Sequence, residues 1–203
     1  MKKIKVVFAL LLGLSLLFSC KKDDDESDAF SDFQASFSAT IDGSAYSVKG
    51  DDKKWFSGSM SQGFFGTSYS AGLSREAFSF SLDIYLEKEY LYPADTVDNN
   101  PTRAEMEEFF KVGTYQFKND SVVDGFNFYY TDDAGTTWST SGGDQSTSNI
   151  KIVSSTSSVS EEGDIDIIVE SQFNCTLYKL GDNTASKVVK DGVLKGKYSE
   201  LHF

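Results

Sequence analysis

Residues 165–177 read IDIIVESQFNCTL, and this stretch decides the fold. Apolar or small side chains occupy every second position along it: Ile165, Ile167, Val169, Ser171, Phe173, Cys175 and Leu177. A period of two is typical of a β-strand that buries one face. The pattern therefore predicts one long strand, with Cys175 on its inner face as a small core residue rather than a reactive thiol.

The same period recurs on both sides of this strand. It covers residues 33–41, 46–48, 69–73, 78–86, 115–117, 126–130, 150–152 and 188–198, with turn signals such as Asp42-Gly43 and Asp191-Gly192 between segments. Strands that are joined by short polar turns and have one apolar face each predict an antiparallel sheet. We expect one all-β domain over 32–203, an antiparallel β-sandwich or, alternatively, a calycin-like open barrel.

One segment departs from this period. The sequence PTRAE from Pro101 contains a capping-box start, and Met106, Phe109 and Phe110 then share one helical face. Gly113 is a helix stop signal. We expect one short helix near 102–111 that packs its aromatic face on a sheet edge or a barrel mouth.

The N-terminus has the layout of a secretory signal. Three lysines lie within Met1–Lys5, and the uncharged, mostly apolar run Val6–Phe18 follows. This run is shorter than the roughly 20 residues that span a bilayer. Leu17-Phe18-Ser19-Cys20 resembles the lipobox of bacterial lipoproteins, although Phe18 is bulkier than usual. The resemblance implies removal of residues 1–19 and acylation of Cys20 at its sulfur and its amino group, which would anchor the protein in the outer membrane.

A charged run follows Cys20. Residues 21–26 read KKDDDE, and blocks of charge are solvated and do not pack, so residues 20–31 are predicted to be a tether. The run resembles the export signal that sends Bacteroidetes lipoproteins to the cell surface. A spacer without sorting content is the alternative.

Composition excludes several function classes. The chain of 203 residues has 19 Lys+Arg and 31 Asp+Glu, a net charge of −12 that becomes −15 without Lys2, Lys3 and Lys5. Such a charge opposes binding to nucleic acid, whose phosphates need basic residues. The only histidine is His202, beside the C-terminus, and Asp132-Asp133 lacks EF-hand spacing. We expect no cofactor, no metal site and no catalytic residue, which leaves a small carboxylate-based hydrolase as the enzymatic alternative.

Aromatic residues are the best candidates for a ligand site. Trp55 follows a charged turn, and Tyr129 and Trp138 fall on the two strands of one expected hairpin. Flat rings on a sheet hold sugars well, so these three residues are predicted to bind a ligand, against the alternative that they fill the core.

Two short motifs indicate modification. Asp95-Thr96-Val97 and Asp120-Ser121-Val122 resemble the acceptor triplet for O-glycosylation of exported Bacteroidetes proteins. Both fall in expected loops, where an acceptor hydroxyl is exposed, so Thr96 and Ser121 are predicted acceptors.

Several pieces of the domain together resemble an uncharacterised family of Bacteroidetes lipoproteins. They are FSATIDGSAYSV from Phe37, VGTYQF from Val112 and the closing segments up to Tyr198. The resemblance implies an all-β surface or periplasmic domain and brings no catalytic residues. We therefore expect a surface-anchored, non-enzymatic module that binds a glycan or a partner protein. A periplasm-facing accessory subunit of an outer-membrane complex is the alternative.

Overall fold

The computed structural model describes residues 33–50, 54–63, 66–77, 81–91, 101–119, 122, 124–159 and 163–200. These residues contain eleven strands, one α-helix and one 3-10 turn. In chain order they are β1 (Ser36–Ile41), β2 (Ser44–Lys49), β3 (Phe56–Gly63), β4 (Gly66–Ser74), β5 (Ile84–Leu91), α3 (Arg103–Phe109), β6 (Gly113–Tyr115), β7 (Phe126–Thr131), β8 (Thr137–Ser139), η1 (Thr140–Gly142), β9 (Asn149–Val159), β10 (Ile165–Lys179) and β11 (Asp182–Glu200).

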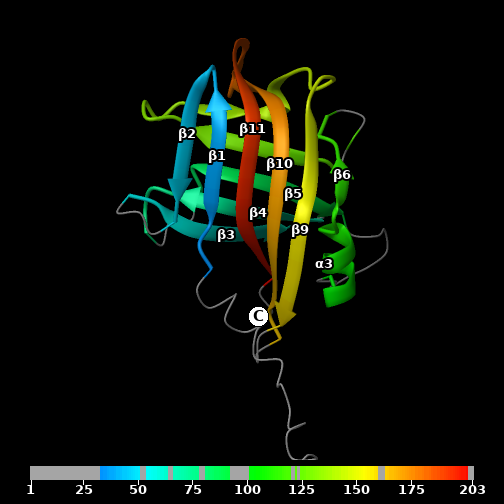
Figure 1. The fold of residues 1–203 in the computed structure, drawn as a ribbon. Coiled ribbons are helices and arrows are strands. Elements are labelled where there is room, and N and C mark those ends of the chain that lie inside the picture. Colours follow the sequence, from blue (N-terminus) through cyan, green and yellow to red (C-terminus); the bar gives the residue numbers. More distant parts are fainter. Residues whose placement is uncertain are drawn as a thin grey trace, which may run out of the picture. The chain divides into compact units, whose positions relative to one another are not determined.

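The strands form two layers of one open antiparallel sheet. The hydrogen-bonded order is β2-β1-β11-β10-β8-β7-β5-β4-β3, and β9 pairs with both β10 and β6. In Figure 1, β2, β1, β11, β10 and β9 run upright in front, and β3, β4 and β5 cross behind them. The expected all-β antiparallel domain with one short helix is therefore confirmed.

Strand β10 connects the two layers. It pairs with β9 from Ile165 to Asn174, and farther along Tyr178 and Lys179 pair with β8. The inward positions predicted from the sequence are buried, and Cys175 is a free thiol within this core. Between the layers the ring of Phe173 packs on Phe128, with centroids 4.7 Å apart. Aromatic side chains bury large apolar areas, so such contacts dominate the packing energy.

Local signals explain the first hairpin and the helix. Asp42 and Gly43 both have positive φ, 48° and 81°, the conformation that a tight two-residue hairpin turn requires. Thr102 and Glu105 form the predicted capping box, which starts α3 at Arg103. The helix ends at Phe109 with Phe110 as its cap, so Gly113 does not terminate it and instead begins β6.

Among the described residues, no helix has the length and apolar character needed to cross a membrane.

Candidate functional site

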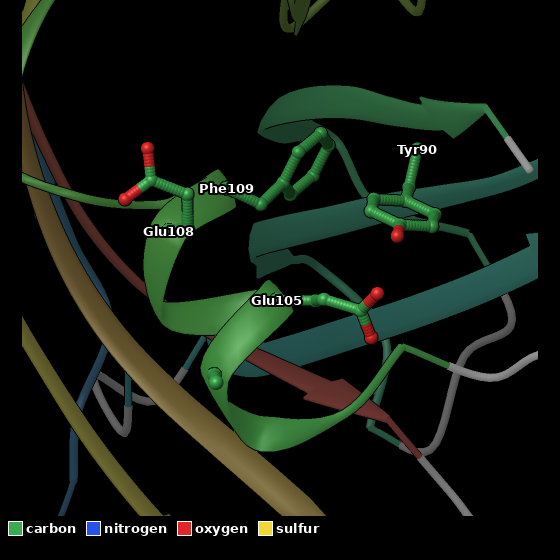
Figure 2. A pocket seen from close by; sticks show the side chains of 5 residues that line it. Tyr90, Glu105, Glu108 and Phe109 are labelled. Atoms are coloured by element: carbon green, nitrogen blue, oxygen red, sulfur yellow. The ribbon is translucent and has the colours of Figure 1, made fainter. Parts of the chain in front are cut away.

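An open groove lies between α3 and the end of β5. It has a volume of about 350 Å³ and is lined by Tyr90, Ala104, Glu105, Glu108 and Phe109. Figure 2 shows Phe109 and Glu105 pointing from the helix toward Tyr90, whereas the carboxylate of Glu108 turns the other way. The Tyr90 and Phe109 rings meet edge to face, with centroids 5.3 Å apart at 79°. The groove therefore combines two aromatic rings and a methyl group with the carboxylate of Glu105, whereas the carboxylate of Glu108 pairs with Lys111.

The capping box fixes the carboxylate of Glu105. Glu105 Oε2 accepts hydrogen bonds from the Thr102 backbone N–H at 2.8 Å and from the Thr102 hydroxyl at 2.7 Å. These bonds, the backbone one foremost, hold the pKa of the Glu105 carboxyl below its usual value. The groove thus has an ionised, oriented carboxylate beside Tyr90.

A buried lysine lies behind the groove. Lys88 on β5 is 4% exposed, and its Nζ donates a 2.6 Å hydrogen bond to the backbone carbonyl of Phe109 at the end of α3. Aromatic rings surround the ammonium, with centroids 3.9 Å away for Phe109, 4.5 Å for Tyr115, 5.4 Å for Phe126 and 5.9 Å for Phe110. A cation is favoured both over ring faces and at a helix C-terminus. Lys88 therefore attaches α3 to the sheet and positions Phe109 in the groove.

Burial changes the acidity of this lysine. Desolvation lowers the pKa of Lys88 to about 8, since a charge buried among rings loses its hydration. Asp124 raises this pKa and Lys111 lowers it, both by charge interactions smaller than the effect of burial.

Trp55 and Trp138, both predicted ligand residues, lie around one turn. Trp55 is only 8% exposed, and the Arg75 guanidinium lies 4.9 Å from its ring centroid. Trp138 donates from Nε1 to Asp132 Oδ2 at 2.9 Å, and Lys187 Nζ lies 4.5 Å from its ring centroid. The ring of each indole is therefore already in contact with a cationic side chain of this protein.

Arg75 connects the two tryptophans. Its Nη2 donates to the Thr131 carbonyl at 2.8 Å and its Nη1 to the Asp132 carbonyl at 3.3 Å. Asp132 Oδ1 also accepts the backbone N–H groups of Ala134 and Thr136, each at 3.0 Å. Burial raises the pKa of Asp132, but the hydrogen bonds from Trp138, Thr136 and Ala134 outweigh it, so that this pKa is lowered. Asp132 therefore organises its own turn.

Tyr129 lies apart from the tryptophans. It shares the β7–β8 hairpin with Trp138, as the sequence indicates. Tyr129 pairs with Ser139, however, and Trp138 with Tyr130, so Tyr129 and Trp138 point to opposite faces of the sheet. The expected shared platform does not form, and Tyr129 instead stacks on Tyr85 with ring centroids 4.6 Å apart.

Other predicted sites lie outside the described residues or away from the groove. Cys20, Thr96 and Ser121 are among the positions that the structure does not describe. Cys175 is buried, and desolvation raises the pKa of its thiol, so its expected position in the core is confirmed. Within the described ranges, no group of three or more His, Cys, Asp or Glu residues could hold a metal ion.

Two residues of this region were missed by sequence reasoning, and their spacing was the available signal. The inward alternation that includes Ile84 and Leu86 reaches Lys88 and Tyr90 at the next positions. A lysine at an inward position predicts a buried charge that needs a partner.

Comparisons of this chain with family models, with curated proteins and with solved structures find no match.

Proposed function

We propose that this chain is a lipid-anchored, non-enzymatic binding domain at the cell surface, and that it holds a glycan in the groove between α3 and β5. The location rests on the lipobox-like residues around Cys20 and on the acidic run after it. Both features, together with the resemblance to a family of Bacteroidetes lipoproteins, support the anchor and its outward orientation.

The groove lining is the observation that carries the glycan assignment. Sugar rings present C–H groups that pack on aromatic faces and hydroxyls that donate to carboxylates. Tyr90 and Phe109 supply the rings, and Glu105 supplies the carboxylate acceptor. Because Glu105 is held by Thr102, its position is set before a ligand arrives, which lowers the entropy cost of binding.

The charge state of Glu105 favours binding over hydrolysis. A glycosidase needs one carboxyl that keeps its proton at neutral pH and donates it to the leaving group. The pKa of Glu105 is instead lowered by its hydrogen bonds from Thr102. This side chain is therefore an acceptor for ligand hydroxyls and a poor general acid.

A panel of purified polysaccharides tests the proposal. The full-length protein in detergent should retain at least one of them, and Tyr90→Ala should weaken binding about tenfold by removing one stacking ring. Glu105→Gln should also weaken it, because it removes the charged carboxylate beside Tyr90 while a glutamine can still form the capping box with Thr102. Glu107→Gln is the matched control, since Glu107 lies on the same helix but pairs with Arg103 and Ser157 outside the groove.

Three results would contradict the proposal. They are the absence of any bound glycan, equal affinities for the wild type and the two groove variants, and release of new reducing ends from a bound glycan. The third result would favour the carboxylate-based hydrolase.

A further inference from the structure

The charges along α3 leave one carboxylate without a cation. The helix and the two residues after it contain three glutamates and two basic residues. Arg103 Nε pairs with Glu107 Oε1 at 2.6 Å, and Lys111 pairs with Glu108. Each basic residue thus neutralises one carboxylate. The remaining carboxylate is that of Glu105, which lies in the groove beside β5.

Glu105 has an oxygen that a ligand can reach. Its Oε2 accepts both hydrogen bonds from Thr102, whereas no donor among the described residues bonds to its Oε1 and no cation among them pairs with the carboxylate. The side chain is exposed, so a ligand in the groove can contact it. An ionised carboxylate has about four acceptor positions, and Thr102 uses only two of them.

The positive charge behind the groove is already used within the protein. Lys88 is 4% exposed, its Nζ lies 3.9 Å from the Phe109 ring centroid, and it donates to the Phe109 carbonyl. A cation on a ring face weakens the attraction of that ring for a second cation. A cationic ligand group is therefore best placed at Glu105, which points toward Tyr90 (Figure 2).

A sugar that fits this groove carries a positive charge. Uronic acids and sulfated sugars would bring a negative charge to Glu105, in a chain whose net charge is already −12. A neutral sugar offers hydroxyl donors, but the ammonium of an amino sugar offers charge-assisted donors, which bind roughly twice as strongly. In a hexosamine the ammonium is attached to the same ring whose C–H groups pack on an aromatic side chain.

We propose that the groove between α3 and β5 selects amino sugars, with Tyr90 packing on the sugar ring and Glu105 Oε1 accepting from its ammonium. This inference rests on the proposed glycan function and specifies the class of sugar. The groove volume of about 350 Å³ is at the small end of the range for ligand pockets, so it holds a short segment of the glycan.

A matched pair of ligands separates the charge from the sugar. Oligosaccharides of β-1,4-linked glucosamine and of N-acetylglucosamine share one backbone at equal length, and only the first carries ammonium groups. Calorimetry of the full-length protein in a nonionic detergent should show about fivefold tighter binding of the glucosamine oligomer at low ionic strength and mildly acidic pH, the upper range for an exposed ion pair. This affinity ratio should shrink in high salt.

Two variants assign the preference to one side chain. Glu105→Gln can keep the capping box but loses the charge, so the affinity ratio should fall below about twofold while the melting temperature changes little. Glu107→Gln makes the same change in net charge on the same helix, outside the groove, and should leave the ratio at about fivefold.

Several outcomes overturn the inference. They are equal or tighter binding of the N-acetylated oligomer, an unchanged ratio in Glu105→Gln, and an equal fall of the ratio in Glu107→Gln. A linear diamine that displaces the glucosamine oligomer at equal concentration also overturns it, because charge alone would then be recognised. If a neutral glycan binds through Tyr90 and the glucosamine oligomer does not, the glycan function stands and the amino-sugar class is wrong. If no glycan binds, both proposals fail.

Discussion

Replacing Lys88 with methionine tests whether a charged lysine is buried behind the groove. Methionine has a similar length and is apolar, so it fills the space among the rings without the charge. In the wild type the ammonium loses hydration and gains the Phe109 carbonyl and the surrounding ring faces. The free energy of unfolding should therefore depend on pH through this residue.

The sign and size of this change in the free energy of unfolding follow from the pKa values of Lys88 in the folded and unfolded states. Burial lowers the pKa of Lys88 from 10.5 to about 8. Below pH 8 the lysine is charged in both states, and the full cost of burying that charge opposes folding. Above pH 8 the folded state releases the proton that the unfolded state keeps up to about 10.5, so stability rises with pH. Between pH 7 and pH 9 this residue should add about 1.3 kcal/mol to the free energy of unfolding.

Urea denaturation of the wild type and of Lys88→Met at pH 7 and pH 9 measures the pH-dependent contribution of Lys88 to the free energy of unfolding. Burial raises the pKa of the Cys175 thiol and of several tyrosines, which lowers stability as pH rises, but these contributions are common to both proteins. The change in unfolding free energy between the two pH values should be more positive in the wild type by about 1.3 kcal/mol. Identical changes in the two proteins would refute a buried, charged Lys88.

Four further predictions concern other residues. Cys175 should react with thiol reagents only after unfolding, and fast labelling of the native protein would contradict its burial. Gly72→Ala should lower the free energy of unfolding by about 2 kcal/mol or more, measured in urea, because a Cβ there would lie 1.9 Å from a backbone carbonyl oxygen of β5. Cys20→Ser should abolish incorporation of a fatty-acid analogue, and undiminished label would disprove the anchor. The intact mass of the protein from its native host should exceed that of polypeptide plus lipid if Thr96 or Ser121 carries a glycan, and an exact match to the unmodified mass would exclude both.

The sequence predicts the elements better than their arrangement. Alternation alone locates the inner face of β10, and the capping box locates the start of α3 within one residue. No local pattern reveals that β10 leaves β9 and joins β8 at Tyr178, because that change depends on which distant strand lies beside it. The path between the two layers is therefore a property of tertiary structure.

For the candidate sites, too, the sequence predicts individual residues better than which of them come together. Tyr129 and Trp138 were correctly placed on one hairpin, but their faces depend on the register, which pairs Tyr129 with Ser139. The spacing of Lys88 on its strand could have predicted an inward charge, whereas the ring set around it comes from α3, β6 and β7.

The pairing of β1 with β11 constrains the order in which the chain can fold. Ser36 lies opposite Lys195 and Ile41 opposite Val189, so the first strand depends on the last one for its place in the sheet. A chain delivered N-terminus first, as in synthesis or secretion, holds the β1–β2 hairpin without a sheet to join until β11 arrives. An isolated hairpin is only marginally stable in water, and contacts between distant segments form slowly. Early release of a truncated chain would thus expose β1 and β10 as unpaired, aggregation-prone edges.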